Sequence, residues 1–235
     1  MPFGNFSLEE LARYLGQDAR ELKRWAERGQ MPGMMVGGKW RFNRAEMLDW
    51  AQSQMHKLDE RVVHDLERAM IANSKELLIS SLLPTKGVNM LLPARSAGSV
   101  LRELTNLAHA TELLYDADTL LRALQDREAL CSTALPKGVA LPHPRRPLPY
   151  AIAEPFICLA HVPAGVPFSA PDGKLTDLFV LICCQDEQEH LQVLARLAVM
   201  LSDSQFVENL RGIVDRDAAI TLLTETENRL RANRK

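Results

Sequence analysis

Two unbroken apolar runs of strand length limit the folds that this chain can adopt. They are Phe156–Val162 and Leu178–Cys184, and neither alternates between apolar and polar residues. Strands of this kind are buried on both faces, which requires helices on both sides of the sheet. Helical periodicity is found at 96–110, 117–128, 187–201, 204–211 and 216–227, and shorter extended segments are expected at 77–83, 88–92 and 138–142. The pattern predicts an α/β domain over residues 77–235, with a mixed sheet flanked by helices.

The first 52 residues have a different pattern, typical of a compact helical module with a hairpin. A capping box at Ser7–Glu10 predicts the start of a first helix, and Asp18 can cap a second helix. Two short extended runs flank the pair Gly37-Gly38, which indicates a hairpin. A third helix is expected over about 44–50. Residues 1–52 are therefore predicted to form a small winged helix-turn-helix domain.

Residues 53–76 keep a helical pattern and join the two predicted domains. Apolar residues share one face, and charged residues occupy the remainder. Two roles fit this pattern. The segment is either a solvated spacer that packs partly on a neighbouring domain, or the seam of a homodimer.

Composition excludes several classes of protein. The chain has 235 residues, 46% of them hydrophobic, which is enough for two domains with their own cores. A formal net charge of -2 argues against a protein that coats nucleic acid or membrane over its whole surface. The four cysteines form neither a CxxC pair nor a regular disulfide spacing, which fits a reducing cytoplasm. No stretch approaches the roughly 20 apolar residues that cross a bilayer, so we expect a cytoplasmic protein without membrane insertion.

The sequence predicts no metal site, no cofactor and no use of ATP as a phosphoryl source. Cys183 and Cys184 are adjacent in a strand pattern, so their thiols point to opposite faces. His161 lies inside an apolar strand pattern, where a packed core histidine is expected. The Gly37-Gly38 pair lacks both the spacing and the Lys-Ser/Thr pair of a Walker loop.

One histidine follows a segment with a characteristic order of residues. Residues 126–133 read DREALCST, and residues 138–143 read GVALPH. This order resembles the active-site signature of type-2 EIIA domains of the bacterial phosphotransferase system, of the nitrogen-regulatory and mannitol or fructose kind. Further family-like segments extend the resemblance over essentially all of 77–235: Gly165–Phe168, Thr176–Leu181, Glu189–Leu191, Leu210-Arg211 and Leu222-Leu223.

The resemblance implies a role for each residue of a phosphoryl-transfer site. His143 is the implied phosphoacceptor, Arg127 a phosphate-binding residue and His190 a second active-site histidine. Histidine titrates near neutrality and so offers an unprotonated ring nitrogen as a nucleophile, while a planar guanidinium suits the equatorial oxygens of a phosphoryl group. Ser132 and Thr133 are expected to donate hydroxyl hydrogen bonds to the same group. This interpretation requires that a donor can reach the imidazole of His143, and that Arg127 and His190 lie beside it.

Pro144 departs from the family pattern, in which a glycine often follows the active histidine. Proline has no N–H, so a backbone donor to the phosphate is lost, which puts partner choice and transfer kinetics in question. Arg145 either replaces that donor electrostatically or is a solvated charge. Simpler roles are open for the other residues too, because Arg127 can pair with a neighbouring carboxylate and His190 can be an ordinary residue at a helix start.

The N-terminal module resembles excisionase-like helix-turn-helix domains related to the MerR family. The resemblance is carried by SLEELA at 7–12, LKRW at 22–25, and Pro32 with VGGKWRF at 36–42. Trp25 and Trp40 are expected in the core of this module. Between Arg20 and Arg44, seven cations less two carboxylates leave a local net charge of +5.

This basic patch predicts a DNA-binding face. The second helix is expected to enter a major groove, and the hairpin wing to reach phosphates. The residues expected to contact DNA are Arg20, Lys23, Arg24, Arg28, Lys39 and Arg41. Useful specificity requires a dimer that reads two half-sites. The alternative is a helix-turn-helix scaffold that docks a protein.

Together the two resemblances predict a bacterial-type regulator in which an EIIA domain is coupled to a DNA-binding head. Phosphorylated HPr or a related carrier donates to His143, and the added negative charge changes how the domain packs on the head or on a partner. One alternative is a sugar-transport component that passes phosphate to the cysteine of a separate EIIB protein. Another is a protein-interaction regulator that binds no DNA.

Overall fold

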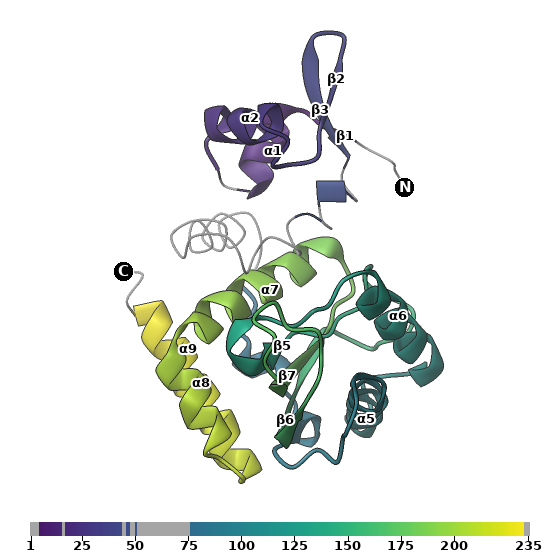
Figure 1. Ribbon diagram of the computed structural model, residues 1–235, viewed down its shortest axis with the longest axis vertical. Helices are drawn as coiled ribbons and strands as arrows, with labels where there is room; N and C mark the ends of the chain where they lie inside the picture. Colours follow the sequence, from purple (N-terminus) through teal and green to yellow (C-terminus); the bar gives the residue numbers. More distant parts are fainter. Residues whose placement is uncertain (1–4, 16, 44–45, 48–49, 51–75, 233–235) are drawn as a thin grey trace. The chain divides into compact units, whose positions relative to one another are not determined.

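The structure is a computed structural model that describes residues 5–15, 17–43, 46–47, 50 and 76–232 (Figure 1). The chain divides into two compact units: Met1–Glu76 with Leu194–Ser202, and Leu77–Val193 with Asp203–Lys235. Most of the predicted third helix at 44–50, and the predicted joining segment at 53–76 except for its last residue, lie outside the described residues.

The described residues of the N-terminal unit include two short helices and a small antiparallel sheet. Its elements are β1 (Asn5–Phe6), α1 (Leu8–Leu15), α2 (Ala19–Glu27), β2 (Met34–Val36) and β3 (Lys39–Asn43), and the strand order is β1-β3-β2. Strand β1 was not predicted, because two residues carry no periodicity. It is held in place by Phe6, a buried residue that pairs with Phe42 of β3.

Side-chain caps fix where both helices begin, as the sequence predicts. The backbone N–H of Ser7 donates to Oε2 of Glu10 at 2.7 Å, and the N–H of Glu10 donates to Oγ of Ser7 at 3.2 Å. Asp18 accepts the backbone N–H of Arg20 at 2.7 Å. These caps satisfy N–H groups that the helix itself leaves unpaired.

The tryptophans of this unit are half-buried rather than fully buried. The Trp25 ring centroid lies 6.0 Å from that of Trp50, and Trp40 stacks on Phe42, also at 6.0 Å. Each indole therefore packs on another aromatic ring of its own unit. This agrees in part with the prediction that Trp25 and Trp40 lie in the core.

The second unit is built on a four-stranded mixed sheet. Its strands are β4 (Val88–Asn89), β5 (Val139–Ala140), β6 (Phe156–Val166) and β7 (Thr176–Cys183), in the order β4-β6-β7-β5. The central pair is antiparallel, and each outer strand is parallel to its neighbour. The two apolar runs are the two central strands, so the predicted fold class is confirmed.

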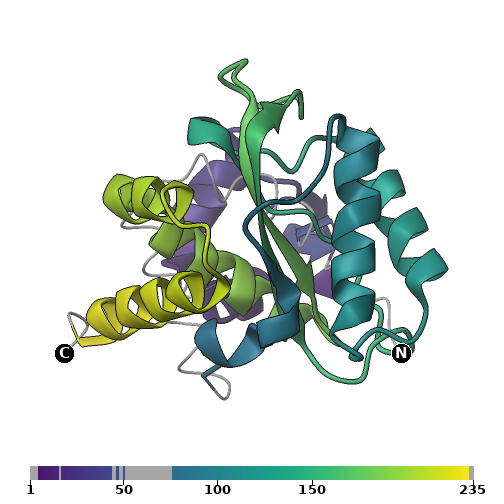
Figure 2. The ribbon, with the colours of Figure 1, turned by 90° about the horizontal axis from the view of Figure 1, so that it is seen from below.

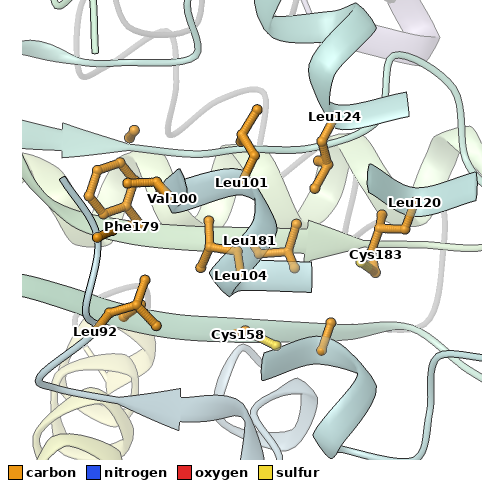
Figure 3. Close-up of a cluster of buried hydrophobic side chains, with 14 of the residues drawn as sticks. Leu92, Val100, Leu101, Leu104, Leu120, Leu124, Cys158, Phe179, Leu181 and Cys183 are labelled. Carbon is orange, nitrogen blue, oxygen red and sulfur yellow. The ribbon is translucent and has the colours of Figure 1, made fainter. Parts of the chain in front are cut away.

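Helices cover both faces of this sheet. Figures 1 and 2 show α5 (Ala97–Ala110) and α6 (Ala117–Leu130) on one side, and α8 (Ser204–Arg211) and α9 (Arg216–Ala232) on the other. Alternate residues of the central strands, such as Cys158 and Leu181, pack against Leu104 of α5 (Figure 3). The remaining helix, α7 (Glu187–Ser202), follows β7 in the chain.

The predicted extended segment at 77–83 is wrong. Residues Ser80–Leu82 instead form a 3-10 helix. The cause is the buried carboxylate of Glu227 in α9, which accepts the backbone N–H groups of Ile79 at 2.7 Å and Ser80 at 3.0 Å. The donors that a strand would direct to a neighbouring strand are thus taken by a side chain 147 residues away.

Candidate active site

The segment that ends at His143 is held on both sides. On one side β5 pairs with β7, and Ala140 lies opposite Phe179. On the other side Ala134 forms a bridge with Ala140. Just beyond the strand, the N–H of Ile182 donates to the carbonyl of Pro142 at 3.0 Å. His143 therefore follows a short strand whose backbone is fixed almost up to the histidine itself.

A backbone carbonyl sets the tautomer of His143. Its Nδ1 lies 2.6 Å from the carbonyl oxygen of Leu141. Because a carbonyl oxygen only accepts hydrogen bonds, Nδ1 carries the proton and donates it to Leu141. In the neutral ring this leaves the lone pair on Nε2, which is buried and has no hydrogen-bond partner among the described residues. Nε2 is thus the ring nitrogen whose lone pair is available for attack on an electrophile.

His190 lies against His143 from the first turn of α7. The two ring centroids are 5.0 Å apart, with an angle of 57° between the rings. Helix α7 begins at Asp186, whose carboxylate accepts the N–H groups of Gln188 and Glu189. A residue in the first turn lies at the positive end of the helix dipole, which favours an anion close by.

Arg127 completes the cluster from the last turn of α6. Its side chain is 8% exposed, and Nη1 donates to the carbonyl of Cys131 at 2.6 Å. Burial, followed by the charges of His190 and Arg127, holds the pKa of His143 well below its usual range. Burial and the charge of Arg127 lower the pKa of His190 to about 4. The three predicted site residues are brought together, and both imidazoles are neutral at pH 7.

The expected access to His143 is not found in this conformation. The residue is 3% exposed, and Nε2 is buried. The ring lies against His190, and its two neighbours in the sequence, Pro142 and Pro144, are also buried. Contact between Nε2 and another molecule therefore requires a local movement of the groups around it.

The hydroxyls that were expected to bind phosphate donate to other groups here. Oγ of Ser132 donates to the carbonyl of Phe168 at 2.5 Å. Oγ1 of Thr133 donates to a carboxylate oxygen of Glu128 at 2.7 Å. Arg145 is exposed, two residues beyond His143. A phosphate-binding role for Ser132, Thr133 and Arg145 stays a prediction.

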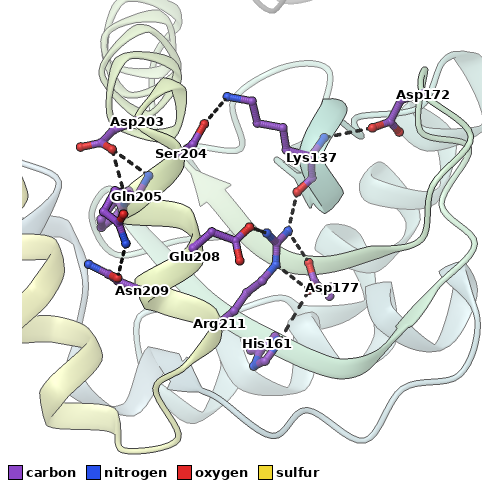
Figure 4. Close-up of polar contacts among 11 residues, drawn as sticks. Lys137, His161, Asp172, Asp177, Asp203, Ser204, Gln205, Glu208, Asn209 and Arg211 are labelled. Atoms are coloured by element: carbon purple, nitrogen blue, oxygen red, sulfur yellow. Dashed lines mark hydrogen bonds and ion pairs between the residues drawn. The ribbon is translucent and has the colours of Figure 1, made fainter.

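A second polar cluster lies near the start of β5 (Figure 4). Arg211 of α8 donates to both carboxylate oxygens of Asp177, at 2.7 and 2.9 Å, and to the carbonyl of Lys137. His161 is buried, as predicted, with Nε2 3.9 Å from Asp177. Gly138 has φ +75°, and a Cβ atom there would lie 2.7 Å from the Arg211 guanidinium. The cluster therefore fixes the backbone where it enters β5.

The N-terminal unit presents the predicted cations at its surface. Arg20, Lys23, Arg24, Arg28 and Lys39 are exposed, and Arg41 is half-buried. A groove of about 680 Å³ separates α2 from the wing. Its charged lining comprises Glu9, Lys23, Glu27, Lys39 and Arg41. Three of the predicted cations, Lys23, Lys39 and Arg41, thus line a groove between the two elements that were expected to contact DNA.

The described part of the chain has neither a candidate membrane span nor a candidate metal-binding cluster. There, no helix is both long and apolar enough to pass through a bilayer. Within the same residues, no three or more His, Cys, Asp or Glu side chains gather where they could hold a metal ion.

Known proteins are similar to both parts of the chain. A helix-turn-helix family profile matches residues 6–55. A nitrogen regulatory protein of Pseudomonas aeruginosa is 32% identical over 139 residues, which cover 58% of this chain and 88% of that protein. The crystal structure of the nitrogen regulatory protein IIA-Ntr from Neisseria meningitidis is 26% identical, with a TM-score of 0.56, and the match covers 62% of this chain and 98% of that one.

A second similar structure is the complex of enzyme IIAMTL and phosphorylated enzyme IIBMTL from Escherichia coli. It is 21% identical with a TM-score of 0.50, and covers 60% of this chain and 95% of that one, which shows the fold alone. The profile "Phosphoenolpyruvate-dependent sugar phosphotransferase system, EIIA 2" matches residues 81–226. That match spans more than half of the chain and includes Arg127, His143 and His190. The protein therefore belongs to the type-2 EIIA family of the phosphotransferase system.

Proposed function

We propose that this protein is a phosphoryl carrier in which His143 accepts a phosphoryl group from phosphorylated HPr or a related carrier. One observation carries the proposal: Nδ1 of His143 is hydrogen-bonded to a carbonyl, which leaves Nε2 unprotonated. The charge of Arg127 acts on this ring, and the neutral His190 lies against it. Membership of the EIIA family supports the same chemistry.

The transfer needs no proton movement within the site. The Nε2 lone pair of His143 forms a bond to phosphorus while the bond between phosphorus and the donor nitrogen breaks, and that electron pair returns to the donor. The Nδ1 proton stays on the bond to Leu141, so the phosphorylated ring carries a positive charge that the carbonyl dipole stabilises. Arg127 is placed to neutralise the phosphoryl oxygens in the transition state.

The N-terminal unit turns the carrier into a regulator in this proposal. Residues 1–52 form a DNA-binding head, residues 53–76 join it to the carrier domain, and 77–235 carry the phosphoryl group. The helix-turn-helix match and the exposed cations of α2 and the wing support DNA binding. The charge added at His143 changes the affinity of the head for DNA or for a protein partner.

A second candidate function is that of a transport component. The Escherichia coli IIAMTL structure was solved with phosphorylated IIBMTL, so an EIIA fold of this kind can meet an EIIB protein. In that case phosphate passes from His143 to a cysteine of a separate chain. Loss of phosphate from the labelled protein to added EIIB proteins, compared with binding to promoter DNA, discriminates the two functions.

Intact mass spectrometry of the full chain tests the carrier role. Incubation with a phospho-HPr regenerating system is expected to add one phosphoryl group, and His143→Ala is expected to abolish the gain. His109→Ala is the matched control, because His109 is an exposed histidine on α5. Absence of any gain, or a gain that survives in His143→Ala, would contradict the proposal.

Salt dependence tests the head separately. The full chain is expected to bind a mixed-sequence DNA duplex at low salt, with log affinity falling linearly against log salt concentration. Fluorescence anisotropy titrations of Lys39→Ala are expected to show a slope smaller by about 1, the loss of one phosphate contact. Arg102→Ala, an exposed cation of α5, should leave the slope unchanged. Failure to bind any duplex at low salt would favour the protein-docking alternative.

A further inference from the structure

A continuous chain of hydrogen bonds leads from the carboxylate of Glu128 to the imidazole of His143. Glu128 accepts the backbone N–H of Thr133 at 3.1 Å with each of its oxygens, and the Thr133 hydroxyl at 2.7 Å. The carbonyl of Thr133 accepts the N–H of Leu141 at 3.1 Å. The carbonyl of Leu141 then accepts the Nδ1 proton of His143. Each link is a direct contact, so the chain has no gap.

Because the acceptor at the start of this chain of hydrogen bonds is a carboxylate, it favours one conformation of Thr133 over others. Hydrogen bonds to a carboxylate are stronger than those between neutral groups, and two donors of one residue converge on Glu128. Thr133 is 6% exposed, so its N–H and hydroxyl have little access to water as an alternative partner. The carboxylate therefore fixes the conformation of Thr133, which lies in the loop between α6 and β5.

Fixing Thr133 also fixes Leu141. The Thr133 carbonyl and the Ala134 to Ala140 bridge hold this stretch of backbone in one register. The carbonyl of Leu141 is consequently aimed at Nδ1 rather than free to rotate. The direction of that carbonyl decides which nitrogen of His143 keeps its proton, and so which nitrogen can attack phosphorus.

We propose that Glu128 is a positioning residue for phosphoryl transfer: through Thr133 and Leu141 it holds His143 in the Nδ1-protonated tautomer with Nε2 as nucleophile. This inference rests on the proposed phosphoacceptor role of His143. It assigns Thr133 to the support of the nucleophile in the unphosphorylated protein. Partners that orient a functional histidine in this way, as at metal sites, typically change activity by roughly 10- to 100-fold when they are lost.

The test measures the tautomer of His143 and the rate of phosphoryl transfer in separate experiments. Nitrogen-15 chemical shifts of the His143 ring in the unphosphorylated full chain report the tautomer without any donor, and the rate of phosphorylation by phospho-HPr reports the chemistry. Glu128→Ala is expected to give a measurable share of the Nε2-protonated form and a roughly tenfold slower transfer. Glu128→Gln keeps an acceptor for Thr133 and should recover most of both. Asp126→Asn, an exposed carboxylate of the same helix, should change neither.

Thr133→Val provides a second route to the same answer if Glu128→Ala fails to fold. It removes the hydroxyl donor but keeps the Thr133 carbonyl, so an intermediate effect on the tautomer is expected. Unchanged nitrogen-15 shifts in folded Glu128→Ala and Thr133→Val, with only a lower unfolding temperature, would overturn the inference. Because the shifts need no phosphoryl donor, failure of the carrier proposal is seen separately, as a wild-type protein that is not phosphorylated.

Discussion

Replacement of Arg127 by alanine is expected to slow phosphoryl transfer to His143 by roughly 10²- to 10³-fold, the usual cost of removing one preorganised group that stabilises transition-state charge. Arg127 is 8% exposed, so solvent screens its charge little. The same charge lowers the pKa of both His143 and His190, so Arg127 acts electrostatically on the two imidazoles of the proposed site. Rapid-quench measurement of phosphorylation by phospho-HPr gives the rate constant.

Two matched variants separate this effect from a loss of structure. Arg122→Ala removes an exposed arginine from the same helix and should leave the rate unchanged. Arg127→Lys keeps the charge but loses the planar fork, so an intermediate rate is expected. The Arg127→Ala variant also loses the hydrogen bond to the Cys131 carbonyl, so its unfolding temperature must be measured beside its rate. A wild-type rate in folded Arg127→Ala would remove this residue from the site.

Lowering the pH from 6.5 to 4 is expected to reduce the free energy of unfolding by about 3 kcal/mol through His190 alone. Burial lowers its pKa to about 4 in the folded protein, against 6.5 when it is exposed. Between these values the unfolded chain binds the proton and the folded chain does not, so acid favours unfolding. The contribution of neutral His190 to the free energy of unfolding is fully present above pH 6.5 and is lost as the pH falls towards 4. His143 acts in the same direction, since its pKa is also lowered.

Urea unfolding at a series of pH values measures this dependence. His190→Gln cannot take up a proton, so its stability should fall less steeply between pH 6.5 and 4 than that of the wild type. His109→Gln, on the exposed face of α5, should follow the wild-type curve. The slopes are compared rather than the absolute stabilities, because a substitution at a buried position changes packing as well. Parallel curves for the wild type and His190→Gln would contradict the burial of a neutral imidazole.

Local patterns in the sequence predict most of the fold. The runs that become β6 and β7 are apolar at every position except His161, so their central position follows from their composition. The capping box at Ser7–Glu10 and the cap at Asp18 predict the starts of two helices for a similar reason, because each depends on residues two or three positions apart. The 3-10 helix at Ser80–Leu82 depends instead on Glu227, far along the chain, and no local pattern contains that information.

The sequence predicts which residues form the candidate site, but it does not predict how they are arranged in space. The segment from Arg127 to His143 is continuous in sequence and carries a characteristic order, whereas His190 arrives from α7, a separate helix. The enclosure of His143 depends on how that helix packs, which the order of residues does not encode. The part played by Glu128 was missed although it lies within the same signature, because its partner is the backbone of a loop residue.

The buried position of Nε2 has a consequence for the lifetime of a phosphoryl group on His143. If a phosphoryl group is attached to Nε2, its hydrolysis requires water to attack the phosphorus atom, and burial of Nε2 restricts the approach of water on that side. The movement of surrounding groups that loading of Nε2 requires would then also control spontaneous hydrolysis. Under the proposed carrier function, the lifetime of the phosphoryl group on His143 is set by how often the site opens.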